Sequence, residues 1–233
     1  MQETLVSNTP VRPEHTFPQT TLPKAARAVI IGGGVAGASV AYHLTKLGWD
    51  DVVLVEQGRI GSGTTWHAAG MVGSLRTSSS QTKINKYSVE LYSQLEKETG
   101  HDIGWLEGGS LIVGTCEERM TQLRRTAAMA EVFGVEAHLL DAEASREKWP
   151  LIRTDDVLGG VWLPRDGRVI PGHTAIAMAK GAANRGAIIQ EETRVEEVLM
   201  KDERAVGVRT NKGDIQAEMV IMTGGMWTRQ LGL

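Results

Sequence analysis

The glycine-rich turn at residues 32–37 constrains the fold of this chain more than any other feature. Its sequence is GGGVAG, and it follows the run Ala28–Ile31, which is apolar, largely β-branched and without alternation. Such a run is typical of a strand buried on both faces of a parallel sheet. A second run of this kind, Val52–Val55, comes after a segment long enough for one helix. The sequence therefore predicts a strand–turn–helix–strand unit in an α/β fold.

The segment between these strands fits a single helix. Residues 36–47 carry Val40, Leu44 and Leu47 at helical spacing, and Gly48 follows as a stop signal. We expect these three side chains to form the apolar face of the helix.

The glycines match the G-x-G-x-x-G spacing of a dinucleotide-binding turn, and each has a physical task. Gly32 permits the tight turn, Gly34 lets the backbone approach a pyrophosphate, and Gly37 lets the helix lie close to the sheet. The free N–H groups of the helix N-terminus attract phosphate. Glu56 ends the second strand, where it would accept hydrogen bonds from ribose hydroxyls and repel a 2′-phosphate. A strand–turn–helix without a ligand is the alternative, and the combination of features favours a dinucleotide site.

Two later segments favour FAD over NAD as the dinucleotide. Residues 58–70 read GRIGSGTTWHAAG, a small and hydroxylated stretch that suits contact with a pyrophosphate and a ribityl chain. The run Met219–Met222 predicts a last buried strand, and the TGG at 223–225 with Trp227 gives a second close approach of backbone to a cofactor. A nicotinamide dehydrogenase does not need the first of these segments there.

Helix and strand patterns alternate through the rest of the chain. Ile84, Tyr87, Leu91 and Leu95 recur at helical spacing before Gly100. Further helices are expected around 120–127, between Asp141 and Pro150, and over 173–184. Strands are expected at 110–113, 160–163, 195–200 and 205–210, with a turn at 211–214.

These motifs together resemble the N-terminal region of the D-amino-acid oxidase and glycine oxidase superfamily, and within it sarcosine and dimethylglycine dehydrogenases. The matching stretches are IIGGGVAGASVAYHLTKLGW from Ile30, VVLVEQGRIGSGTTWHAAG from Val52, ETG followed by GW between Glu98 and Trp105, DG at Asp166, and TGGMW from Thr223. The likeness covers nearly all of the chain after residue 26.

The resemblance implies an α/β fold in which a Rossmann-like FAD-binding domain carries an inserted, incomplete β-rich substrate domain. The expected bounds are a flexible leader at 1–26, FAD-binding segments at 27–100 and 166–233, and a partial substrate domain at 101–165. Family members continue past the position of Leu233, so the resemblance implies an N-terminal fragment. Two further departures are Ile170, where the family has Asp before Pro, and Gly224, where it has Ala.

The resemblance also assigns roles to single residues. In the related dehydrogenases the histidine of the TTWHAAG motif carries the flavin covalently, a role that would fall on His67, and the backbone at Val195 would meet the adenine. A turn histidine packed beside Trp66 is the alternative for His67. The full candidate set for cofactor binding is Gly32, Gly34, Gly37, Glu56, Gln57, Ser62, Thr64, Thr65, His67, Gly70, Val195, Thr223, Gly224 and Trp227. Neither a catalytic base nor a metal ligand set is predicted.

The reaction implied by the resemblance is oxidation of an N-methyl amino acid such as sarcosine or dimethylglycine, with hydride passing to FAD. The expected partners are a small-molecule amine and, as electron acceptor, an electron-transfer flavoprotein or oxygen, with folate only if a C-terminal domain exists. A non-catalytic relative, the regulatory subunit of pyruvate dehydrogenase phosphatase, is the main alternative, because AYHLTKLGW and VLVEQGR resemble it. Trp66 and His67 favour the enzyme. An inactive fragment is the third possibility.

Composition narrows the partners and the compartment. A net charge of -3 gives no reason to expect nucleic acid or an acidic membrane surface. No apolar run approaches the roughly 20 residues that span a bilayer. Cys116 is the single cysteine, which suits a reducing compartment. Residues 1–26 are rich in proline and polar residues without a signal pattern, so we expect a mobile arm and a soluble cytoplasmic protein.

For the remaining candidate side chains, a structural role is at least as well supported as a functional one. Trp105 and Trp162 are expected in a core rather than in a substrate cavity. Arg76 is equally compatible with a substrate carboxylate and with solvent. The other histidines show no ligand spacing, and no role is assigned to them.

Overall fold

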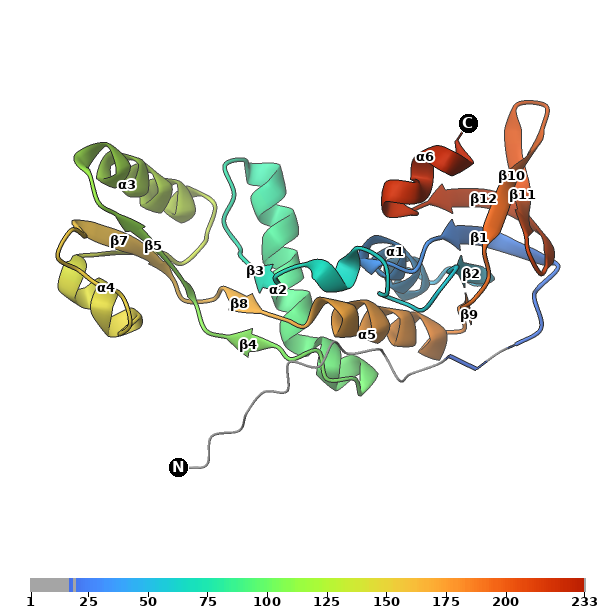
Figure 1. The fold of residues 1–233 in the computed structure, drawn as a ribbon, viewed down its shortest axis with the longest axis horizontal. Helices are drawn as coiled ribbons and strands as arrows, with labels where there is room; N and C mark the ends of the chain where they lie inside the picture. The colour runs from blue at the N-terminus through green and yellow to red at the C-terminus, as the bar shows by residue number, and fades with distance from the viewer. Residues whose placement is uncertain (1–16, 19, 233) are drawn as a thin grey trace. The chain divides into compact units, whose positions relative to one another are not determined.

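The computed structural model describes residues 17, 18 and 20–232, and the chain divides into two compact units (Figure 1). Unit 1 comprises the described part of Met1–Ala68 together with Lys97–Asp102 and Pro171–Leu233. Unit 2 comprises Ala69–Glu96 and Ile103–Ile170. The largest difference from the expected bounds concerns Ala69–Glu96, which was expected in the FAD-binding segment 27–100 but belongs to unit 2.

Unit 1 is built on a six-stranded sheet of order β10-β11-β12-β1-β2-β9. Its parallel part contains β1 (Ala25–Ile31), β2 (Val52–Val55), β9 (Ile188–Gln190) and the second half of β12 (Gly213–Met222). β10 (Val195–Lys201) and β11 (Arg204–Thr210) extend the sheet as an antiparallel meander. Because β1 has a parallel neighbour on each side, its carboxyl end lies between those of β2 and β12, and the glycine turn begins there.

Two helices of unit 1, α1 (Val35–Lys46) and α5 (Pro171–Asn184), pack against each other (Figure 1). The buried side of α1 consists of small residues and one aromatic: Gly37, Ala38, Ala41, Tyr42 and Thr45. The expected apolar face was wrong, since Val40 and Leu44 are only half-buried and Leu47 is 78% exposed. Close packing decided the face: a Cβ on Gly181 of α5 would lie 2.8 Å from the ring of Tyr42, so only small residues fit between the helices.

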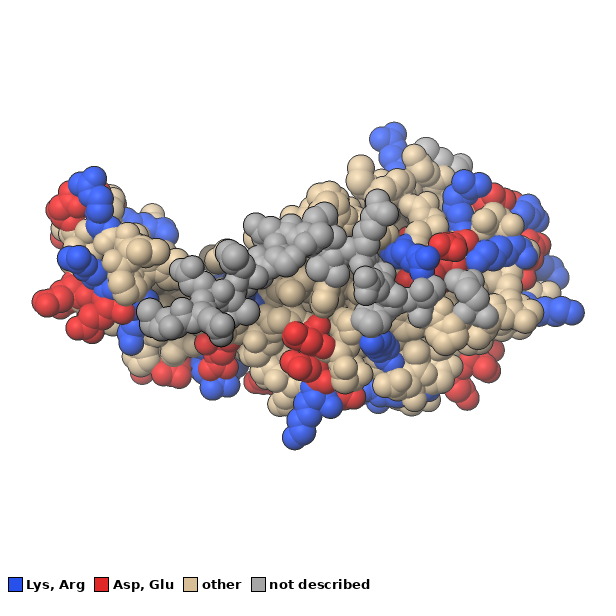
Figure 2. Space-filling model, turned by 60° about the horizontal axis from the view of Figure 1, so that its bottom comes forward, with Lys and Arg blue, Asp and Glu red and all other residues tan. Residues whose placement is uncertain are grey.

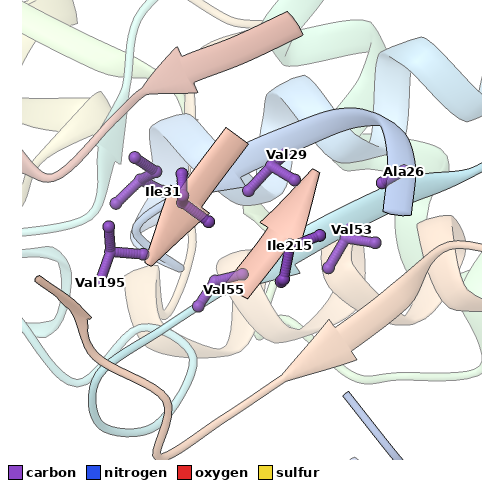
Figure 3. Close-up of a cluster of buried hydrophobic side chains, with 8 residues drawn as sticks. Ala26, Val29, Ile31, Val53, Val55, Val195 and Ile215 are labelled. Atoms are coloured by element: carbon purple, nitrogen blue, oxygen red, sulfur yellow. The ribbon is translucent and has the colours of Figure 1, made fainter. Parts of the chain in front are cut away.

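Side chains alternate between the two faces of the sheet in unit 1, and Figure 3 shows the buried cluster that lies on one of these faces. Val29, Ile31, Val53 and Val55 of the parallel strands pack with Val195, Val208 and Ile215 of the meander. The alternate residues, such as Ile30 and Leu54, are fully buried as well. The prediction of strands buried on both faces is therefore confirmed for β1 and β2.

The prediction for the last strand was wrong in its start and its burial. β12 begins at Gly213, because its polar first part pairs antiparallel with β11 before the strand continues beside β1. The turn is correspondingly tight, with Thr210 paired to Gly213 across Asn211 and Lys212. Met219 is 43% exposed and Met222 is 36% exposed. An apolar run allows a strand to be buried, but its actual burial depends on which other elements of the fold pack over it.

The segment expected to be a mobile leader is ordered where the structure describes it. β1 starts at Ala25, the side chain of Phe17 is buried, and the backbone and hydroxyl oxygens of Thr20 accept hydrogen bonds from Gln190. The prediction failed here because long-range contacts hold a segment that has no periodicity of its own. Residues 1–16 and 19 lie outside the described residues.

Unit 2 combines helices with two small sheets. The helices are α2 (Ser79–Thr99, continuing into unit 1), α3 (Glu117–Val132) and α4 (Ala142–Lys148). One sheet has the order β3-β8-β4, from Met71–Val72, Gly167–Arg168 and Leu106–Glu107, and the other has the order β5-β7-β6, from Ser110–Gly114, Gly159–Leu163 and His138–Leu140. The core of unit 2 contains Met120, Leu123, Ala130, Val135, Val161 and Leu163.

Two expectations for unit 2 can be compared with its packing. Leu91 and Leu95 of α2 are buried, but Ile84 is 66% exposed and Tyr87 is 42% exposed, so only one end of the predicted apolar face is covered. Trp105 and Trp162 are half-buried, and each indole lies against a glycine, Gly167 and Gly109 respectively. These tryptophans therefore pack within unit 2.

Charged side chains of both signs are mixed on the face that Figure 2 presents. Figure 2 shows acidic and basic groups interspersed on the face it presents, without a large area of one sign among the described residues. No helix in the described part of the chain combines the length and the apolar character that crossing a bilayer requires.

Candidate functional site

A cleft of about 790 Å³ in unit 1 lies where the glycine turn leaves β1. This volume is within the range of small-molecule sites. Of the sequence-predicted residues, it is lined by Gly32, Gly34, Glu56, Gln57, Ser62, Thr64, Thr65, Val195, Thr223, Gly224 and Trp227. The cleft therefore brings together segments from both ends of the chain.

The glycines of the turn have different physical roles. Gly32 has a φ of +104°, and a Cβ there would lie 2.7 Å from the carbonyl oxygen of Thr223. A Cβ on Gly37 would lie 1.8 Å from the carbonyl oxygen of Gly32, so this position must lack a side chain for the helix to meet the strand. A Cβ on Gly34 would meet only the hydroxyl of Thr65, at 3.1 Å. Gly34 thus keeps the cleft open, whereas Gly32 and Gly37 allow the backbone to pack.

The carboxylate of Glu56 is held by two backbone amides at the edge of the cleft. Gly33 donates its N–H to Oε2 at 2.6 Å, and Gly58 donates its N–H to Oε1 at 2.8 Å. A carboxylate has about four acceptor positions, so each oxygen can accept a further hydrogen bond. The two amides therefore orient Glu56 without using up its capacity to bind hydroxyl groups.

The hydroxylated loop after β2 caps the start of α1. The hydroxyl of Thr65 accepts the N–H of Val35 at 2.9 Å, and the hydroxyl of Ser62 accepts the N–H of Arg59 at 3.2 Å. On the other side, Thr223 donates its hydroxyl to the carbonyl of Ile31 at 2.8 Å. The Thr65 contact holds the loop to the start of α1, the Ser62 contact lies within the loop, and the Thr223 contact joins the segment after β12 to the end of β1.

Four cleft residues escaped the sequence reasoning: Thr193, Arg194, Asn211 and Leu231. The N–H of Arg194 donates to the side-chain oxygen of Asn211 at 2.8 Å, and the N–H of Asn211 donates to the carbonyl of Arg194 at 3.0 Å. The sequence positions of three of them could have indicated the cleft, since Thr193 and Arg194 directly precede Val195 and Asn211 lies in the predicted turn.

Three predicted residues do not line the cleft. Gly37 is buried in α1, and Gly70, with a φ of +78°, belongs to unit 2. His67 is exposed in the short helix η1 (Thr65–His67). Its ring lies against that of Trp66, with centroids 3.9 Å apart and planes tilted by 34°, and its Nδ1 lies 3.2 Å from the carbonyl oxygen of Gly63.

Comparison with known protein families identifies the family of this chain. The family model described as FAD dependent oxidoreductase matches residues 27–233. The chain belongs to the FAD-dependent oxidoreductase family.

Several relatives and one solved structure show the range of this family. The chain is 40% identical to 4-methylaminobutanoate oxidase (formaldehyde-forming) of Paenarthrobacter nicotinovorans, over 90% of this chain and 26% of that protein. It is 39% identical to the mitochondrial pyruvate dehydrogenase phosphatase regulatory subunit of Mus musculus (91% and 24%) and 34% identical to the mitochondrial sarcosine dehydrogenase of Homo sapiens (92% and 24%). The structure of L-proline dehydrogenase from P. horikoshii matches with a TM-score of 0.85 at 29% identity, covering 91% of this chain and 56% of that one. The chain thus spans about a quarter of the length of these curated relatives.

The residues of this FAD-dependent oxidoreductase chain fit the ADP half of its cofactor. The cleft offers a glycine turn free of side chains, the start of α1 at Val35 and Ala36, and the oriented carboxylate of Glu56. A helix start favours phosphate, and a carboxylate accepts hydrogen bonds from ribose hydroxyls. Within the described residues, no group of three or more His, Cys, Asp or Glu side chains is arranged to hold a metal ion.

Proposed function

We propose that this chain is the FAD-holding part of an enzyme that oxidises N-methyl amino acids. The observation that carries the proposal is the cleft itself, in which the glycine turn, Glu56 and the segment from Thr223 converge in a chain of the FAD-dependent oxidoreductase family. The names of two relatives, 4-methylaminobutanoate oxidase (formaldehyde-forming) and sarcosine dehydrogenase, support a substrate that carries an N-methyl group.

Each part of the cleft has a task in this proposal. Gly32 and Gly34 allow the backbone to approach the diphosphate, and Glu56 binds the adenosine ribose. The segment from Thr223 to Trp227 and the backbone at Val195 complete the walls. Bound FAD supplies the hydride acceptor, and the protein's contribution is to hold and orient it. The electron acceptor, a requirement for folate and a cytoplasmic location stay predictions.

His67 is proposed to attach the flavin covalently. Support comes from its place in the hydroxylated loop, where the neighbouring Ala68 and Thr65 line the cleft. The contact between Nδ1 and the carbonyl of Gly63 favours the tautomer with hydrogen on Nδ1. Nε2 then keeps its lone pair, which is what a neutral imidazole needs to act as a nucleophile.

The test measures flavin binding and amine oxidation separately. Apoprotein is titrated with FAD, and the loaded protein is then mixed anaerobically with sarcosine, dimethylglycine or 4-methylaminobutanoate while flavin absorbance at its visible maximum is followed. Bleaching by an N-methyl amine, but not by the same amine without its methyl group, supports the proposal. A protein that fails to bind FAD contradicts it.

A regulatory role is the second candidate, because one relative at 39% identity is named a pyruvate dehydrogenase phosphatase regulatory subunit. In the same experiment, this candidate predicts that FAD binds and that no amine bleaches it. The stacked pair Trp66 and His67 favours the enzyme, since a regulator has no need of a flavin attachment residue.

A further inference from the structure

We propose that Glu191 is a positioning residue of the FAD cleft, which aligns three cleft segments that are distant in sequence. The inference rests on the proposed function of this cleft. Glu191 is 1% exposed and does not line the cleft, so any effect on FAD must pass through other residues.

The side chain of Glu191 joins two segments far from it in sequence. Its Oε1 accepts the N–H of Ile60 at 2.8 Å, and its Oε2 accepts the N–H of Phe17 at 3.3 Å. Nη1 of Arg59 lies 3.7 Å from Oε2. A buried carboxylate is strongly destabilising unless it is paired and hydrogen-bonded, so these contacts fix where residues 59 and 60 can lie.

The backbone around Glu191 joins the remaining walls. Its carbonyl accepts a hydrogen bond from Nζ of Lys212 at 3.2 Å and from the hydroxyl of Thr193 at 2.9 Å. Lys212 neighbours Asn211, and both Asn211 and Thr193 line the cleft. The loop after β2, the entry to β10 and the turn between β11 and β12 therefore all meet at this one residue.

The contacts lead from Glu191 to the carboxylate proposed to bind ribose. Ile60 packs against the glycine turn so closely that a Cβ on Gly33 would lie 2.4 Å from its Cδ1. Gly33 and Gly58 donate the two amides that orient Glu56. Main-chain bonds reinforce this path, from the N–H of Glu56 to Gln190 at 2.9 Å and from the N–H of Thr193 to Glu56 at 2.8 Å. A shift of Ile60 relative to Glu191 thus changes the orientation of Glu56.

The test compares Glu191→Gln with Glu192→Gln in the whole chain. Glutamine keeps the shape but has a single acceptor oxygen, so it can accept the N–H of Ile60 or that of Phe17 but not both, and it carries no charge to pair with Arg59. The control is matched in sequence and chemistry, because Glu192 is the neighbouring glutamate, its side chain is 58% exposed, and it pairs with the same Arg59 at 3.1 Å. We expect the Kd of both FAD and ADP to rise about tenfold in Glu191→Gln, as for loss of a hydrogen bond to a charged group, and to stay within about twofold in the control.

A double substitution distinguishes positioning from a general loss of stability. If Glu191 acts through Glu56, the double variant Glu191→Gln/Glu56→Ala binds ADP about as weakly as Glu56→Ala alone, because coupled residues are not additive. Additive losses overturn the inference. Lys212→Met, which removes one contact to the Glu191 carbonyl, should raise the ADP Kd by a few-fold without unfolding the chain, and an unchanged Kd there counts against it.

The outcomes separate this inference from the proposed function. Wild-type protein that binds neither FAD nor ADP overturns the proposed function and this inference with it. Wild-type protein that binds both, together with a Glu191→Gln variant of unchanged Kd, overturns the inference alone. The midpoint of thermal unfolding of each apoprotein shows whether the variant is folded when it is titrated.

Discussion

Alanine at Gly37 should lower stability and alanine at Gly34 should lower FAD affinity, although both glycines belong to the same motif. At Gly37 the new Cβ would lie 1.8 Å from the carbonyl oxygen of Gly32 and 2.7 Å from the hydroxyl of Thr223. Cβ atoms essentially never lie within 3.0 Å of a non-bonded heavy atom, so the strand and the helix would have to separate by roughly 1 Å. At Gly34 the Cβ would meet only Thr65 Oγ1, at 3.1 Å, in a backbone conformation that any residue adopts.

The magnitudes follow from these distances. Gly37→Ala gains about 1 kcal/mol from helix propensity, but overpacking against backbone that cannot rotate away typically costs 1–3 kcal/mol or more. A contact of 1.8 Å with backbone places the cost at the upper value of about 3 kcal/mol, so we expect a net loss of about 2 kcal/mol in the free energy of unfolding. Gly34→Ala should change that free energy by about 1 kcal/mol or less, as for a helix cap. Because Gly34 lines the cleft, Gly34→Ala should weaken FAD binding by about tenfold or more, and Gly34→Val should weaken it further.

Urea unfolding of the apoproteins and FAD titration followed by flavin fluorescence measure the two quantities independently. The reasoning requires that stability falls for Gly37→Ala and affinity for Gly34→Ala. Wild-type affinity in both Gly34 variants would show that the diphosphate does not approach this turn. Unchanged stability in Gly37→Ala would refute the packing argument.

Three further predictions concern single side chains. Glu56→Ala should weaken FAD binding by about 1–3 kcal/mol, the value of hydrogen bonds to a charged group, whereas unchanged affinity in the titration would mean that the ribose is held elsewhere. His67→Ala should release all FAD into the supernatant after acid precipitation, while wild-type protein stays yellow with flavin on a peptide that contains residue 67; wholly extractable flavin in the wild type would contradict the covalent link. Burial and the hydrogen bond to Glu98 raise the pKa of Tyr42 to about 12, so the unfolded chain loses this proton first and the stability due to Tyr42 should decline as pH rises from about 10 to 12. Urea unfolding should show that the stability difference between wild type and Tyr42→Phe shrinks over that interval, and a constant difference would argue against the raised pKa.

Local patterns in the sequence predicted most of the residues that the structure brings together around the cleft. The turn GGGVAG, its flanking strands and Glu56 lie close together in sequence, so glycine geometry and strand burial could be inferred without any distant contact. The positive φ of Gly32 and the two amides on Glu56 show why those residue types are needed. The cleft also contains the segment from Thr223, as its glycines indicated.

The predictions that were wrong and the cleft residues that were not predicted share a physical cause, which is that burial depends on partners far away in sequence. Leu47 is apolar but exposed, whereas Ala41 is buried because Tyr42 and Gly181 let two helices approach closely. Phe17 looked like part of a mobile arm, yet its N–H is bonded to Glu191, 174 residues further along the chain. Arg194 and Asn211 join the cleft through a hairpin whose place follows from sheet order and not from any motif.

The described cleft by itself does not distinguish an oxidase from a regulator of the same family. Gly32, Gly34 and Glu56 are all proposed to act on the dinucleotide half, and a regulator that retains FAD needs that half held in the same way. Discrimination must come from residues that act on the reactive ring, and His67 is the candidate for which we propose such a role. His67 is exposed, its ring lies against that of Trp66, and its Nδ1 contacts the carbonyl of Gly63, so Nε2 is the nitrogen proposed to react. The chemical state of His67 in FAD-loaded protein is therefore the observation that separates the two functions.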